Sequence, residues 1–186
     1  ETDPALDLSL ATTTPLKKRP SKTTRAMLSN PNNYSADGPS IDTLFPSVLK
    51  GADLKAVADA WASAIQHGRG VILGMGAHPI KVGLSHLVID LIERGYISGL
   101  AGTGAVALHD WELATHGHTS EEVSDGLPEG RFGMAADTAV AYWKAVELAQ
   151  RENYGLGQAV GALLSTATDN VGPSILATCY NCAVPT

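Results

Sequence analysis

Two short apolar segments, each ended by a glycine turn and followed by a helical pattern, restrict the fold of this chain most. Residues 71–73 run into a turn at 74–76, and residues 96–101 run into a turn at 102–104. The intervening residues 84–92 place apolar side chains at the spacing of one helix face. Strand, turn and helix in this order predict a parallel β-α-β unit. Both turns then lie at the edge of the sheet where ligands of such folds bind.

The other regular patterns are helical. A helix is expected after the N-cap residue Asp53, and further helices over residues 105–115, 135–151, 156–164 and 173–181. One face of the 135–151 helix is expected to consist of Ala139, Tyr142, Trp143, Val146 and Ala149.

Other segments have little regular pattern. Residues 1–46, rich in proline and small polar residues, predict an extended arm that precedes a domain at residues 47–186. Residues 117–134 form a polar connector, in which residues 119–122 have the composition of a short helix start. Residues 183–186 have the composition of an opening strand. So few strands beside so many helices predict an α/β domain that is incomplete at its C-terminus, as in a fragment, a split protein or half of an assembly.

Charge and apolarity argue against several classes of protein. The 186 residues suit one domain, and 13 basic against 19 acidic residues give a net charge of −6, unlike a nucleic-acid binder. No apolar run approaches the roughly 20 residues of a membrane span, and the acidic start lacks a signal-peptide pattern. Having only two cysteines favours a cytoplasmic location. Cys179 and Cys182 fit a redox pair, half a zinc site or, most commonly, a structural role.

A basic cluster lies within the predicted arm. Its simplest interpretation is a solvated segment. The alternatives are docking on the acidic surface of a neighbouring subunit, or a targeting or nucleic-acid patch, although the rest of the chain gives nucleic acid no support. The cluster consists of Lys17, Lys18, Arg19, Lys22 and Arg25.

The second glycine turn has a phosphate-binding pattern. Residues 102–107 fit G-x-G-x-x-G/A between a strand and a helix, where a pyrophosphate can approach the backbone and the first N–H groups of the helix. The usual acidic residue about 20 positions further on is not evident, since Glu121 and Glu122 lie in the connector. Ordinary turn chemistry also explains the glycines. Lys81 has two interpretations as well, a phosphate contact or a solvated side chain.

A second constellation has the spacing of metal ligands. His109, Glu112 and His116 stand at i, i+3 and i+7 of the predicted helix and share one face. They could bind zinc or another divalent cation, with Asp110 and His118 as further donors. A polar helix face without a metal is the commoner explanation of such a pattern.

Residues 71–112 resemble the cofactor-binding region of the deoxyhypusine synthase family. That family has a strand, a Gly and Thr-Ser-Asn-like turn, a helix, a second strand and a Thr-Thr-Ala-Gly-Gly turn before acidic residues. Here Gly74 matches the glycine, residues 76–78 occupy the Thr-Ser-Asn positions, residues 102–106 occupy the second turn, and Asp110 falls on the aspartate. The Gly-Ala-His-x-Ile-Lys-x-Gly-Leu and His-Asp-x-Glu stretches are similar to uncharacterised prokaryotic-type members. The resemblance covers roughly residues 16–186.

The resemblance implies a Rossmann-like three-layer parallel sheet that binds NAD. It also implies a homo-oligomer, a tetramer with active sites between subunits, and NAD-assisted transfer of an aminobutyl group from a polyamine such as spermidine. His109 stands where the synthase has an acidic residue, and the family's polyamine-binding acidic residues and catalytic lysine lie beyond residue 186, so the catalytic residues are unknown. The implied cofactor-binding residues are Gly74, Gly76, Ala77, His78, Thr103, Gly104, Ala105, His109 and Asp110.

Three functions therefore remain open from the sequence. The first is an NAD-binding, deoxyhypusine-synthase-like protein whose sheet is completed by a second chain or a longer form of this one. The second is a metal-dependent enzyme with its site on the 105–116 helix. The third is a non-catalytic assembly subunit that uses the arm and an open sheet edge for oligomerisation.

Overall fold

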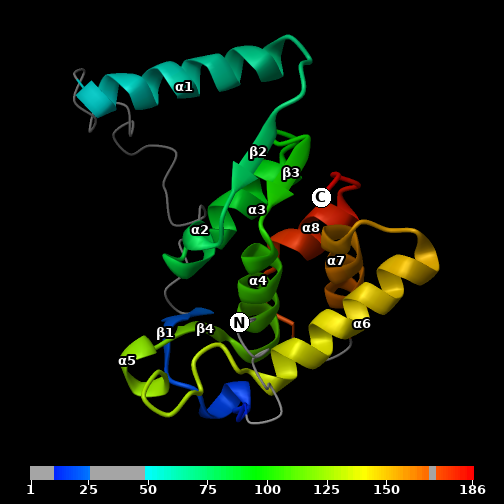
Figure 1. Ribbon diagram of the computed structural model, residues 1–186. Helices are drawn as coiled ribbons and strands as arrows, with labels where there is room; N and C mark the ends of the chain where they lie inside the picture. The colour runs from blue at the N-terminus through cyan, green and yellow to red at the C-terminus, as the bar shows by residue number, and fades with distance from the viewer. Residues whose placement is uncertain (1–10, 26–48, 168–170) are drawn as a thin grey trace, which may run out of the picture.

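The computed structural model describes residues 11–25, 49–167 and 171–186, and most of the predicted arm at 1–46 lies outside these ranges. Over these ranges the fold is mixed α/β and mostly helical, with two separate two-stranded sheets (Figure 1). The elements are the 3-10 helix η2 (Leu16–Lys18), β1 (Ser21–Thr24), α1 (Leu49–Gln66), β2 (Ile72–Met75), α2 (His78–Lys81), α3 (Ser85–Glu93), β3 (Gly99–Gly102), α4 (Gly104–His116), β4 (His118–Glu121), α5 (Val123–Gly126), α6 (Ala136–Glu152), α7 (Leu156–Thr166) and α8 (Ile175–Asn181).

The predicted strand–turn–helix order is confirmed. β2 and β3 form a parallel pair in which Ile72 lies opposite Gly99 and Met75 opposite Gly102, and α2 and α3 make the crossover between them. On the far side of β3, the N–H of Leu100 donates to the carbonyl of Pro185 at 2.9 Å. The C-terminal residues thus lie along β3, as their strand-like composition suggests. Within the described residues the parallel sheet has two strands, and the three-layer sheet stays a prediction.

α4 forms the axis of the molecule, with the parallel sheet at one end and the β1–β4 pair at the other (Figure 1). Its buried side chains join those of α3, α7 and α8 in one apolar core. α7 and α8 approach very closely, because Gly161 faces the backbone of Leu176 with no side chain between them. The core includes Ile80, Ile92, Ile97, Leu100, Val106, Leu113, Val160, Leu164 and Ile175.

Two local predictions were wrong in position. The short helix expected from residues 119–122 starts later: residues 118–121 form strand β4, because they pair antiparallel with β1 of the arm, and α5 begins at Val123 with Glu122 as its N-cap. The predicted face of α6 is rotated: Thr138, Ala141 and Ala145 are buried, while Trp143 is 68% exposed. A helix with apolar residues on two sides does not show from its spacing alone which side meets the core.

The described part of the arm is packed on the body of its own chain. Leu16 is fully buried, and its N–H donates to the Asp137 carboxylate at 3.0 Å. Arg25 donates from Nε to the carbonyl of Leu113 at 3.0 Å, at the C-terminal end of α4. Cations at this end of a helix are favoured by its dipole. The basic cluster is thus partly used within the chain itself.

The structure also bears on the role of the two cysteines and on the expected absence of a membrane span. Cys179 is buried and Cys182 exposed, and both are free. Burial, followed by the nearby Asp110, raises the pKa of the Cys179 thiol to about 12, which suits an inert core side chain. In the ranges that the structure covers, none of the helices has the length and apolarity to cross a bilayer.

Substituting Gly161→Ala is expected to destabilise the fold by about 1–3 kcal/mol or more, because a Cβ there would overlap the Leu176 carbonyl and stand 3.0 Å from Cβ of Tyr180. Urea unfolding followed by circular dichroism measures the loss. Gly74→Ala is the matched control, since its Cβ would meet nothing within 4 Å. Equal stability of the two variants would contradict the proposed α7–α8 contact.

Candidate functional site

The structure brings the two glycine turns together at the carboxyl ends of β2 and β3. Gly74 lies opposite Ala101, and the N–H of Thr103 faces the carbonyl of Met75 at 3.4 Å. A Cβ at Gly74 or Gly76 would meet nothing within 4 Å, so open space adjoins both positions. Of the residues implied in cofactor binding, Gly74, Gly76, His78, Thr103, Gly104 and Ala105 are exposed here, while Ala77 is buried.

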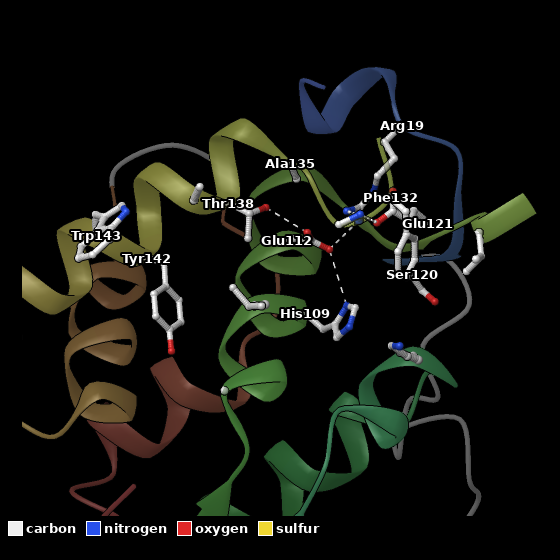
Figure 2. Close-up of a pocket in the computed structure, with 16 residues that line it drawn as sticks. Arg19, His109, Glu112, Ser120, Glu121, Phe132, Ala135, Thr138, Tyr142 and Trp143 are labelled. Carbon is white, nitrogen blue, oxygen red and sulfur yellow. Dashed lines mark hydrogen bonds and ion pairs between the residues drawn. The ribbon is translucent and has the colours of Figure 1, made fainter. Parts of the chain in front are cut away.

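A cavity of about 640 Å³ begins at Gly104 and extends along α4 to β4 (Figure 2). Tyr142 and Trp143 of α6 line one side of it, and Phe132, from the loop before α6, lies on the other side beside Glu121 (Figure 2). The rest of the lining, called the polar wall below, carries polar and charged side chains. These polar lining residues are Arg19, Lys81, His109, Glu112, Ser120, Glu121 and Thr138. Its volume is within the range of small-molecule sites.

A buried carboxylate organises the polar wall. Glu112 is 4% exposed, and its Oε2 accepts from Arg19 at 2.8 Å and from the hydroxyl of Thr119 at 2.5 Å. Its Oε1 accepts from the Thr138 hydroxyl at 3.0 Å. The ring of His109 stands beside this group, with Nδ1 at 2.7 Å from the Thr119 hydroxyl and 3.7 Å from Glu112 Oε2. Four different segments of the chain therefore meet at one carboxylate.

The surroundings of Glu112 keep it ionised. Burial on its own raises the pKa of this carboxyl, but the contacts with His109, Arg19 and Thr119 and the Arg19 charge outweigh burial and hold the pKa at about 2. Arg19 also lies 3.6 Å from Glu121, and both side chains are largely buried. The wall thus contains an ion-pair cluster, in which one guanidinium faces two carboxylates, instead of an isolated charge.

Ser120 adds local strain to the same wall. It lines the cavity with a left-handed backbone, φ 63°, which a non-glycine residue adopts at some cost. Its neighbours Thr119 and Glu121 both point to the ion-pair cluster, through Glu112 and Arg19 respectively. The strained residue thus lies between the two side chains that fix this end of the cavity.

Asp110 is directed away from the glycine turns. It is 1% exposed, and its carboxylate accepts from the Ser174 hydroxyl at 2.6 Å and from the N–H groups of Ile175 and Leu176 at 3.0 Å. Burial raises its pKa, and these three hydrogen bonds oppose the change. The carboxylate therefore anchors the start of α8. Its implied contact with a cofactor stays a prediction.

The three candidate metal ligands do not gather. Glu112 is held by Arg19 and two hydroxyls, and Nδ1 of His116 lies 2.7 Å from the Thr115 hydroxyl. His118 contacts Ser21 at 2.9 Å, and burial is the largest cause that lowers the pKa of both His116 and His118. Within residues 11–25, 49–167 and 171–186, no group of three His, Cys, Asp or Glu side chains has a geometry that could hold a metal ion.

The partners of Glu112 were not found from the sequence. Arg19 was seen only as one member of a basic cluster, Thr119 only as part of a predicted helix start, and Thr138 gave no signal. These side chains are 93, 7 and 26 residues from Glu112 along the chain. A long-range pair of this kind leaves no mark in local spacing.

Comparison with known proteins adds no family to this geometry. No protein-family model matches the chain, and no curated protein matches it.

Replacing Glu112 by Gln is expected to lower stability at pH 7 by about 3 kcal/mol, because the buried Arg19 loses the closer of its two carboxylate partners. The folded pKa of about 2 lies below the ordinary 4.5, so the carboxylate's contribution is complete above pH 4.5 and is lost as pH falls toward 2. Urea unfolding at pH 7 and pH 3 should show a smaller acid loss in Glu112→Gln than in the unsubstituted protein. Asp59→Asn, which removes an exposed pair with Lys55, is the control and should retain the full acid loss.

Proposed function

We propose that this chain is an NAD-binding protein of the deoxyhypusine-synthase-like type, with the dinucleotide on the paired glycine turns. The observation that carries the proposal is the adjacency of the two turns, marked by the 3.4 Å approach of the Thr103 N–H to the Met75 carbonyl. A parallel strand pair with two glycine turns at its carboxyl edge is the setting in which dinucleotides bind. The resemblance over residues 71–112 supports the same ligand.

The turns are suited to a pyrophosphate. Gly74 and Gly76 leave open space where any side chain would stand, so phosphate oxygens can approach the backbone. Thr103, Gly104 and Ala105 form the start of α4, a helix of 13 residues whose first N–H groups attract an anion. Gly104 also lines both the large cavity and a smaller one of about 110 Å³ on the other side of this helix start. The proposed ligand thus has space on either side.

The finer fold belongs to the same proposal. The β2–β3 pair is the centre of a Rossmann-like three-layer sheet, and the segment along β3 marks its continuation. β2 has no strand on its outer side among the described residues, and Ile72 at its start is 75% exposed. A second subunit, or a further chain, completes this sheet in a homo-oligomer. The open edge equally favours the second candidate, an assembly subunit without catalysis.

The proposed reaction is aminobutyl transfer from a polyamine. When bound, NAD would supply a hydride acceptor for the amine carbon. The chain's own residues bind and orient: the turns hold the pyrophosphate, His78 adjoins the first turn, and His109 lies further along α4 facing the cavity. Asp110 acts indirectly by holding α4 against α8. The nucleophilic lysine has no counterpart assigned in this chain.

Gly76→Ala tests the cofactor site directly. The new methyl group would meet no protein atom within 4 Å, and the backbone of Gly76 is not left-handed, so the fold should be unchanged. The methyl group would occupy the space through which a phosphate approaches, and NAD affinity should fall about tenfold or more, about 1.4 kcal/mol. Isothermal titration with NAD measures this change.

Gly99→Ala is the matched control for that experiment. It adds the same methyl group at the other end of the parallel pair, where it makes only an ordinary 3.4 Å contact with Ile72. Its NAD affinity should equal that of the unsubstituted protein. Absence of NAD binding to the unsubstituted protein, or equal affinities in all three, would reject the proposed site.

A further inference from the structure

The cavity beside α4 contains an imidazole whose proton position follows from its hydrogen bonds. Nδ1 of His109 and Oε2 of Glu112 both contact the hydroxyl of Thr119, at 2.7 and 2.5 Å. A hydroxyl has one proton to donate. The carboxylate of Glu112 can only accept, so the Thr119 proton goes to Glu112 and the Thr119 oxygen accepts from His109. Nδ1 therefore carries a hydrogen.

The other ring nitrogen is then unprotonated in the neutral imidazole. Thr119 is fully buried, whereas the His109 side chain is 19% exposed and lines the cavity. The ring thus directs Nδ1 toward Thr119 and Glu112, and its other edge, with Nε2, away from them (Figure 2). Nε2 has no hydrogen-bond partner within the part of the chain that the structure covers. Nε2 therefore offers a lone pair to a ligand in the cavity.

The charges around the cavity balance. Arg19 and Lys81 are the cations of the lining, and Glu112 and Glu121 are the carboxylates. Arg19 lies within 2.8 Å of Glu112 and 3.6 Å of Glu121. A lining with as many cations as carboxylates does not select for a net charge on the ligand, and the apolar ring of Phe132 near His109 disfavours one. The cavity therefore suits a neutral ligand with an apolar body.

We propose that this cavity binds a neutral hydroxyl compound, an alcohol or a phenol, whose O–H donates to Nε2 of His109 and whose apolar body lies against Phe132, on the same side of the cavity. When the proton is transferred, the O–H bond breaks, its electron pair stays on oxygen, and a new N–H bond forms at Nε2. The resulting imidazolium donates through Thr119 to the carboxylate of Glu112. His109 is the proton acceptor, and Thr119 and Glu112 are positioning residues. The inference is independent of NAD, because it rests on the other end of the cavity from Gly104.

The tautomer is tested by long-range ¹H–¹⁵N NMR of the full chain. His109 should show the Nδ1–H form, with the ¹⁵N shift of an unprotonated nitrogen at Nε2. His67 serves as an internal reference, because its Nδ1 lies 2.7 Å from the carbonyl of Ser63, which can only accept. In Thr119→Val the preference at His109 should be lost. A hydrogen on Nε2 in the unsubstituted protein would overturn the proposal.

The ligand class is tested with phenol and anisole, which have the same ring but differ in the O–H. Phenol should shift the Nε2 signal of His109 and bind about tenfold more tightly than anisole, because only phenol can fill the acceptor. Thr119→Val should lower this ratio toward one without changing anisole binding.

Thr115→Val is the matched control, since it removes from the helix of His109 a hydroxyl that contacts the Trp111 carbonyl and His116 and is not part of the cavity lining. Its tautomer and its phenol-to-anisole ratio should remain those of the unsubstituted protein. If Thr119→Val does not fold, the comparison of phenol with anisole on the unsubstituted protein still decides. Equal affinities, or no binding of either compound, would overturn the proposal. Neither the NMR measurement nor the binding comparison uses NAD, so a negative result for the hydroxyl-compound site is distinct from a negative result for the NAD site.

Discussion

A carboxylate buried away from water must find compensating donors, and Glu112 finds them in three different segments of the chain. Arg19 comes from the arm, Thr119 from β4 and Thr138 from α6. An ionised group left without them would cost several kcal/mol. The position of the arm, the pairing of β1 with β4 and the tilt of α6 are thus tied to one side chain. The walls of the large cavity depend on the same contacts.

A second buried carboxylate on the same helix, Asp110, faces the opposite side of α4. Asp110 and Glu112 stand two positions apart on α4, which places them on roughly opposite faces. Asp110 accepts hydrogen bonds from the first N–H groups of α8, and Glu112 accepts them from Arg19 and the two threonine hydroxyls. One face of α4 is therefore fixed to α8 through Asp110, and the other face lines the cavity with Glu112. This explains why a helix at the centre of the molecule carries acidic residues at all.

Local features of the fold could be predicted from the sequence, and long-range features could not. Glycine turns and apolar spacing gave β2, β3, α4 and the helix that became α6 within a few residues, because these signals are local. The β1–β4 pair joins segments 97 residues apart, as the Ser21–His118 contact shows, and nothing in either segment points to the other. The candidate site likewise has a part that could be predicted from local sequence and a part that could not. The turns at 74–76 and 102–104 are adjacent, while the role of Arg19 at Glu112 was hidden in a cluster of similar cations.

α1 is attached to this assembly more loosely than any part of the core. Most of its side chains are exposed, and Trp61 joins it to the body through a 2.7 Å hydrogen bond to the Tyr96 carbonyl, beside Ile65 and Leu91. The backbone after the helix turns through a left-handed Gly68. Local opening requires little free energy where few apolar side chains are buried, so amide protons of α1 will exchange with solvent long before those of α7 and α8. Amide protons are thus expected to exchange in two groups, and hydrogen exchange measured on the intact chain distinguishes the fast-exchanging α1 from the slowly exchanging core helices.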